Sequence, residues 1–206
     1  MSNSTGKLVV VTGFSGAGKD TLINLFLQKS SDFEAVVTHS TRPPRPGEIP
    51  GIHHHFVRQE EFETLIQKEE MLEYVKYGSF YKGTTKAEFE KIMRGKNLIW
   101  RVDIFRAAVY EDTFLKVYDR KTAYQLISNS LTIFVKAGNH KITQNRYLNR
   151  EKGKADLNEF QKRLNRDVEL FKQYEHAFPN IILNRSGKAQ ASAGEMERLI
   201  NNFLYQ

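Results

Sequence analysis

The stretch GFSGAGKDT, residues 13–21, combines closely spaced glycines with a lysine. Its glycines allow the backbone to approach a phosphate group, so that successive N–H groups can point at the oxygens. Lys19 adds a mobile ammonium that can reach the outer phosphates of a nucleotide. A glycine, four residues, a second glycine and a lysine is the spacing of a phosphate-binding loop. We therefore predict that the following residues bind nucleotide phosphates: Gly13, Ser15, Gly16, Ala17, Gly18, Lys19, Asp20 and Thr21.

The segments on either side of this loop have the pattern that such a loop requires. Residues 7–13 (KLVVVTG) are a short, largely β-branched apolar run, which is typical of a buried parallel strand. Residues 19–29 place apolar side chains at helical spacing. Glycine-rich turns between a strand and a helix also occur in α/β folds without any ligand. Here the order of strand, loop and helix favours phosphate binding at the helix N-terminus.

Asp20 departs from the usual form of this loop, in which a hydroxyl side chain at that position binds magnesium. A carboxylate beside polyphosphate is repulsive unless a cation lies between them, and magnesium prefers hard oxygen ligands. Asp20 is therefore a candidate Mg2+ ligand, directly or through water. The alternative is that Asp20 caps the helix and Thr21 contacts the α-phosphate. The sequence leaves both interpretations open.

A second group of cations lies in the loop STRPPRPGE, where Arg42 and Arg45 are separated by two prolines. Proline stiffens the backbone, and two guanidiniums on a stiff loop suit the bidentate recognition of a phosphate dianion. The alternative is a pair of solvated surface arginines. With the glycine-rich loop, the sequence thus offers two candidate anion sites.

The composition bounds the class of protein. The 206 residues are 40% hydrophobic and 27% charged, as in an ordinary globular domain, and the net charge of +7 is compatible with an anionic ligand. The basic residues are spread along the chain, so we expect no nucleic-acid partner. With no cysteine, disulfides and thiolate metal sites are excluded. We see no secretory signal and no apolar stretch of membrane-spanning length, and we expect a cytoplasmic protein.

Strands and helices are predicted to alternate, which indicates an α/β fold with a parallel sheet flanked by helices. We expect strands at 7–13, 33–40, 53–57, 97–103, 131–137 and 180–184, and two short strands within 71–84 joined at Gly78. Helices are expected at 19–29, 59–69, 86–96, 120–128, 139–150, 156–175 and 193–205. Between 104 and 130 the pattern is weak, and the helix at 120–128 is the one element expected there.

Four segments in this order resemble guanylate kinases: GFSGAGKDT, THSTRPPRPGEIPGIHHHFV, EFETLIQKEEMLEYVKYGSFYKGT and the late LNR. The resemblance covers most of the chain. It implies a P-loop kinase fold and transfer of the terminal phosphoryl group of ATP to GMP with Mg2+. It also implies a core (1–38, 97–138 and 176–206), an inserted acceptor-binding subdomain (39–96) and a helical lid (139–175).

The resemblance assigns roles by position. Arg42 and Arg45 match residues that grip the GMP phosphate, and Glu48 matches an acid near the metal and the transferred phosphoryl group. Glu73 matches the guanine reader, because a carboxylate can accept from both the ring N–H and the amino group of guanine. Further acceptor-binding positions are matched by Thr38, Tyr81, Thr84 and Asp103. Arg146, Arg150 and Arg163 resemble lid arginines that close over the polyphosphate, and Asn184 matches an asparagine near the adenine.

Three further departures concern the charge of the site. His54 and Lys82 stand where the family has tyrosines that contact the GMP phosphate, and Arg101 stands where it has an acid near the metal. We therefore expect a more cationic acceptor pocket and a magnesium site relocated to Asp20. These changes keep two alternatives open. One is a kinase acting on ribose 1,5-bisphosphate, and the other is a non-catalytic module that binds a phosphoprotein.

Overall fold

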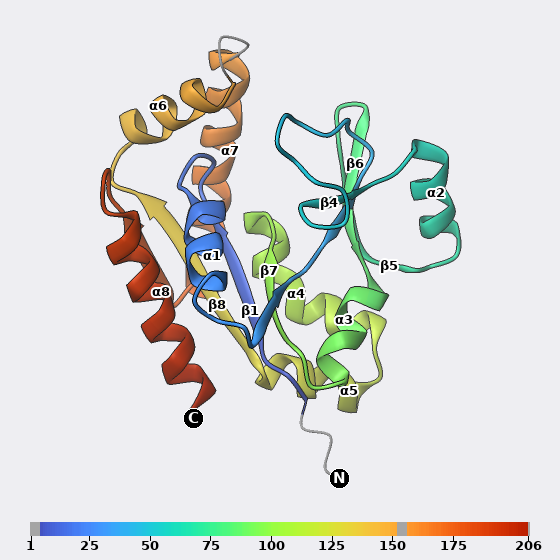
Figure 1. The fold of residues 1–206 in the computed structure, drawn as a ribbon. Helices are drawn as coiled ribbons and strands as arrows, with labels where there is room; N and C mark the ends of the chain where they lie inside the picture. The colour runs from blue at the N-terminus through green and yellow to red at the C-terminus, as the bar shows by residue number, and fades with distance from the viewer. Residues whose placement is uncertain (1–4, 152–155, 206) are drawn as a thin grey trace.

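The computed structural model describes residues 5–151 and 156–205. A five-stranded parallel sheet lies at its centre (Figure 1). The strands, in order across the sheet, are β2 (Phe33–Ala35), β7 (Asn97–Arg101), β1 (Leu8–Gly13), β8 (Ser130–Ala137) and β9 (Asn180–Asn184). All of the pairings between them are parallel. The expected α/β fold with a parallel sheet is confirmed.

Helices cover both faces of this sheet, which explains why β1 is buried throughout and begins with four apolar residues. Val9 and Val11 face a core formed with α1 (Lys19–Leu27) and α8 (Ala189–Leu204). Leu8 and Val10 face the opposite core, formed with α4 (Ile104–Val117), α5 (Arg120–Ser128) and α7 (Leu157–Tyr174). Successive residues of a strand point to opposite faces, so a strand that is buried on both sides reads as a continuous apolar run.

A second, four-stranded sheet lies beside the carboxyl end of the first (Figure 1). Its order is β4 (His54–Phe56), β3 (Thr38–Ser40), β6 (Phe80–Thr85) and β5 (Met71–Tyr77). Helix α2 (Gln59–Gln67) connects β4 to β5, and α3 (Lys86–Met93) leads from β6 back to β7. The predicted turn at Gly78 is confirmed, and its φ of 58° is a conformation that glycine tolerates well.

Two helices, α6 (His140–Glu151) and α7, project above the phosphate loop (Figure 1). Tyr147 of α6 stacks on Phe160 of α7, with ring centroids 4.6 Å apart. Phe14, in the loop after β1, packs against this pair and also contacts Phe171 edge-on at 5.6 Å. The glycine-rich loop and the helical pair therefore share an aromatic contact. The short helix η1 (Glu175–Ala177) completes the connection to β9.

The structure corrects three expectations. Residues 33–40 do not form one strand, because β2 ends at Ala35 in the large sheet and β3 begins at Thr38 in the small one. His53 is outside β4, and its Nδ1 accepts from the backbone N–H of Ile49 at 3.0 Å. Helix α4 occupies most of the region that the sequence left unassigned.

The division into core, acceptor-binding subdomain and lid stays a prediction, and residues 152–155 of the expected lid lie outside the described residues. Within the described ranges, none of the helices has both the length and the apolar character that crossing a membrane would take.

Candidate active site

The glycine-rich loop has the backbone geometry of an anion cradle. Gly16 and Gly18 adopt φ values of 74° and 92°, in the left-handed region that favours glycine. Gly18 is also the N-cap of α1, so the loop leads directly into the positive end of a helix. Lys19 Nζ donates to the carbonyl oxygens of Gly13 at 2.7 Å and Phe14 at 3.0 Å. The ammonium thus lies folded along the loop.

Two side chains from other elements hold the loop in shape. Asn184, at the end of β9, donates from Nδ2 to the Ala17 carbonyl at 2.8 Å, and Arg146 of α6 donates to the same oxygen at 2.9 Å. The peptide group is planar and trans, so the N–H of Gly18 points away from the carbonyl of Ala17. These contacts on the carbonyl side leave the amide side of that peptide facing the cradle. Asn184 is buried, with 1% of its surface exposed.

Asp167 of α7 also contacts the loop, and no sequence pattern predicted this contact. Its Oδ2 accepts from the backbone N–H of Ser15 at 2.7 Å. A carboxylate on a loop amide occupies a direction in which a phosphate oxygen could otherwise accept. Asp167 therefore competes with an anionic ligand in this arrangement.

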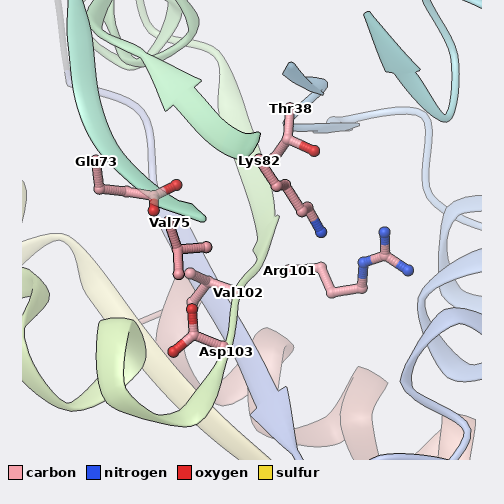
Figure 2. A pocket seen from close by; sticks show the side chains of 7 residues that line it. All are labelled: Thr38, Glu73, Val75, Lys82, Arg101, Val102 and Asp103. Atoms are coloured by element: carbon pink, nitrogen blue, oxygen red, sulfur yellow. The ribbon is translucent and has the colours of Figure 1, made fainter. Parts of the chain in front are cut away.

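A small pocket lies between the carboxyl end of β7 and the second sheet (Figure 2). Residues of four strands (β3, β5, β6 and β7) and of the turn after β7 line it: Thr38, Glu73, Val75, Lys82, Arg101, Val102 and Asp103. Acids lie on one side, whereas the Lys82 ammonium and the Arg101 guanidinium extend on the other (Figure 2). The carboxyl ends of strands in an open parallel sheet are a common ligand-binding edge.

Glu73 is the buried acid of this pocket. Its Oε1 accepts from the Thr84 hydroxyl at 2.8 Å. The Thr84 Oγ1 accepts in turn from Trp100 Nε1 at 3.1 Å. Its Oε2 lies 3.5 Å from Arg106 Nε. Burial raises the pKa of Glu73 to about 7, against the lowering effect of the Thr84 hydrogen bond. The carboxylate is therefore oriented by its neighbours and only partly ionised near neutral pH.

The two residues expected to add positive charge, Lys82 and His54, differ in position and in charge, since only Lys82 lines the pocket. Burial, together with the nearby Arg101, lowers the pKa of Lys82 to about 7. Burial lowers the pKa of His54 to about 3, so this imidazole is neutral at pH 7. Its Nδ1 shares a hydrogen bond with the Thr38 hydroxyl at 2.7 Å, and the residue exposes 4% of its surface. The expectation that His54 adds positive charge is therefore wrong, because a buried imidazole among cations stays unprotonated.

Arg42 and Glu48 form a bidentate pair in the proline-rich loop. Arg42 donates from Nη1 and Nη2 to the two carboxylate oxygens of Glu48, at 2.7 and 2.6 Å. The backbone N–H of Arg45 donates to the same carboxylate at 2.7 Å. The hydrogen bond from Arg42 lowers the pKa of Glu48 to about 2, despite partial burial. Glu48 thus fixes the Arg42 guanidinium and the loop backbone together.

Asp20 and Arg101 form an ion pair between α1 and the end of β7, through Oδ1 and Nη1. Burial opposes the ionisation of Asp20, although the side chain exposes 62% of its surface. The effects of Arg101, Lys19 and Lys82 outweigh it, so the pKa of Asp20 lies below its ordinary value. Asp20 and Arg101 both depart from the usual form of the family, and the two departures are therefore bound to each other.

The family model described as guanylate kinase matches residues 5–190. The chain belongs to the guanylate kinase family. A guanylate kinase of Clostridium perfringens is 42% identical over 104 residues, which are 50% of this chain and 48% of that protein. A guanylate kinase of Neisseria gonorrhoeae is 38% identical over 104 residues, 50% of this chain and 51% of its own. The chain thus matches about half the length of these curated relatives.

Solved structures give the fold. The crystal structure of guanylate kinase from Anaplasma phagocytophilum superposes with a TM-score of 0.67 at 18% sequence identity. The match covers 97% of this chain and 86% of that one. At this identity the likeness establishes the guanylate kinase fold and nothing finer.

The structure brings some of the family positions named from the sequence together and leaves others apart. The phosphate-loop residues, Arg146 and Asn184 lie together at the loop, and Thr38, Glu73, Lys82 and Asp103 line one pocket. Tyr81, Thr84, Arg45 and Thr21 are not among the residues that line this pocket. Tyr81 stacks on Phe62 at 5.2 Å, and Thr84 reaches the pocket only through Glu73. Arg163 pairs with Glu159 on the exposed side of α7 at 2.8 Å. Arg150 lies on α6, but its side chain is outside what the structure describes.

Arg106 is a site residue that the sequence analysis missed. It donates from Nη2 to the Tyr74 carbonyl at 2.6 Å and lies beside Glu73. Asp103 starts α4 by accepting from the Arg106 N–H at 3.1 Å, so the helix start positions the arginine. Arg106 follows Asp103 by three residues at the start of a helix, and this spacing could have indicated it. The helix itself was not predicted from the sequence.

The family generally uses Mg2+ with ATP, so a magnesium site would lie near the phosphate loop. In residues 5–151 and 156–205, no group of three or more His, Cys, Asp or Glu side chains is placed to hold a metal ion by itself. Magnesium usually keeps several waters and takes one or two carboxylates together with substrate phosphates. The ionised, exposed carboxylate of Asp20, next to Lys19, fits that requirement.

Proposed function

We propose that this protein transfers the γ-phosphoryl group of ATP to a phosphate oxygen of GMP. The observation that carries the proposal is the pocket of Glu73 beside the phosphate loop. A carboxylate there can accept from the ring N–H and the amino group of guanine, a pair of donors that adenine does not present on the same edge. The Thr84 and Arg106 contacts orient Glu73 for this task.

The residues of the chain supply positioning and charge. The loop amides and Lys19 hold the ATP phosphates, and Arg42 and Arg45 hold the GMP phosphate. The attacking oxygen is already anionic, so no general base is needed and no covalent intermediate forms. Phosphoryl transfer of this kind depends on alignment and on cations around the transferred group. Arg146, Arg150 and Arg163 are proposed to add cations when the helical pair closes over the polyphosphate.

Magnesium would arrive with the ATP phosphates, and Asp20 would hold it through its water shell. When bound, the ion neutralises phosphate charge. The ion pair with Arg101 leaves Asp20 ionised, which this role requires.

A second acceptor, ribose 1,5-bisphosphate, is favoured by one observation, the Lys82 and Arg101 cations at the pocket. GMP remains the better proposal, because Glu73 and Asp103 line the same pocket and would repel a second phosphate. The non-catalytic alternative is disfavoured by the retained loop glycines and Lys19.

The test is ADP release with ATP and Mg2+ in the presence of GMP, AMP, CMP, UMP or ribose 1,5-bisphosphate. We expect turnover with GMP at least a hundredfold above the other nucleotides, consistent with rejection by a hydrogen-bonding site. Lys19→Met is the control for contaminating kinase activity and should abolish the signal. Higher turnover with ribose 1,5-bisphosphate than with GMP, or no turnover with any acceptor, would refute the proposal.

A further inference from the structure

Arg101 and Asp20 join the two halves of the site. Arg101 is the last residue of β7, and it is the parallel partner of Val11 on β1, the strand that leads into the phosphate loop. Asp20 lies in the first turn of α1, directly after Lys19. Their ion pair therefore spans the carboxyl edge of the sheet from the acceptor side to the phosphate loop.

Arg101 also belongs to the acceptor pocket, where it lies on the same side as Lys82 (Figure 2). It exposes 32% of its side chain, so the guanidinium is accessible to a ligand as well as to Asp20. Two neighbouring cations that repel each other are costly unless an anion binds between them. Arg101 lowers the pKa of both Lys82 and His54, which reflects this crowding of positive charge.

Stability alone does not explain the pair. Exposed ion pairs contribute little to folding stability, because water and salt screen them. By contrast, an arginine held by a carboxylate keeps further N–H donors of its planar fork for a second anion. The transferred phosphoryl group is such an anion, with charge spread over three equatorial oxygens.

We propose that Arg101 is a catalytic residue that donates hydrogen bonds to the phosphoryl group during its transfer, and that Asp20 positions it. The proposal rests on the proposed kinase function. In the step, the bond from the γ-phosphorus to the β,γ-bridging oxygen breaks, with its electron pair leaving on ADP. A bond forms from the same phosphorus to a GMP phosphate oxygen. Arg101 exchanges no proton and carries its full charge throughout.

The experiment compares wild type with Arg101→Gln, Arg101→Lys and Asp20→Asn, measuring kcat, both KM values and thermal unfolding. Arg101→Gln should lower kcat by about 10²–10³-fold, in the range of lost transition-state donors, with KM changed by roughly threefold or less. Added guanidinium ion should restore part of the rate. Arg101→Lys should lose about tenfold or more, because an ammonium lacks the fork. If Arg101→Gln does not fold, Arg101→Lys tests the proposal in its place.

Asp20→Asn should lower kcat by about tenfold or more in the wild-type background and by a smaller factor in Arg101→Gln, because its positioning effect needs Arg101 whereas its effect on magnesium does not. Rescue of Arg101→Gln by added guanidinium ion is the readout that a merely structural pair would not give. Arg94→Gln is the matched control. Arg94 is an exposed arginine paired with Glu90 at 3.2 Å, and it is not among the residues that line the pocket. Its replacement should leave kcat unchanged.

Two results would overturn the inference: a kcat of Arg101→Gln within twofold of wild type, or a loss expressed only in KM. If wild type does not phosphorylate GMP, the proposed function fails on its own. The inference is then decided by slow ATP hydrolysis to water, which should fall in Arg101→Gln by a similar factor. Equal or absent hydrolysis in the two proteins would refute it as well.

Discussion

The pH dependence of GMP use should follow the ionisation of Glu73. Burial raises its pKa to about 7, so at pH 7 about half of the molecules carry the carboxylate that guanine recognition needs. Only the ionised form accepts two hydrogen bonds. We therefore expect kcat/KM for GMP to fall with decreasing pH below 7, approaching tenfold per unit, and to reach a plateau above about pH 8.

Glu73→Gln removes this dependence and most of the affinity. A glutamine oxygen can still accept from Thr84, whereas its amide nitrogen would face the guanine donors in place of an acceptor. A lost hydrogen bond to a charged group, plus the unpaired donor, costs about 3 kcal/mol. At 1.4 kcal/mol per factor of ten, that is on the order of a hundredfold in kcat/KM at pH 8.

The assay is kcat/KM for GMP between pH 5.5 and 9 in both proteins, with ADP release as the signal. The second ionisation of the GMP phosphate, near pH 6, affects both profiles equally. The ratio of wild type to Glu73→Gln therefore isolates the carboxylate. It should rise from small values at low pH to on the order of a hundredfold at pH 8. A ratio that does not change with pH, or stays below threefold, would contradict this reasoning.

Two further predictions follow from the loops. Asp167→Asn should tighten ATP binding by roughly three- to tenfold, because it removes an anion from the Ser15 amide; calorimetry that finds weaker binding would contradict this. The pKa of Glu48 in the folded protein, about 2, lies below its ordinary value of 4.5, so its stabilising effect is present above 4.5 and lost as pH falls toward 2. Measured by thermal unfolding, wild type should therefore lose more stability over that pH interval than Glu48→Gln. Parallel curves of stability against pH in the two proteins would refute the role of Glu48.

Local pattern predicted the framework of this site well. The apolar run before Gly13 and the helical spacing after Lys19 fixed the phosphate loop, because a strand buried on both faces and an amphipathic helix each have a distinctive period. The hairpin at Gly78 was equally local. The strand at 33–40 was different, because its crossing from one sheet to the other at residues 36 and 37 depends on tertiary pairing alone.

Charge at the site was harder to predict than position. The sequence predicted that His54 and Lys82 lie in the acceptor region. It did not predict their burial, which leaves the imidazole neutral. It identified Asp20 and Arg101 as separate departures but not as one ion pair, because 81 residues separate them. Asp167 could not have been found, since its contact with the loop depends on how α7 packs across the molecule.

The central claim is that the phosphate loop and the acceptor pocket hold two nucleotides end to end. It is tested most directly by calorimetry with adenosine and guanosine joined through a short polyphosphate chain, compared with ATP and GMP alone. If the two sites face each other, the joined compound should bind at least a hundredfold more tightly than either nucleotide, because the second contact is then intramolecular. Binding no tighter than ATP alone, with GMP still able to bind afterwards, would contradict the account.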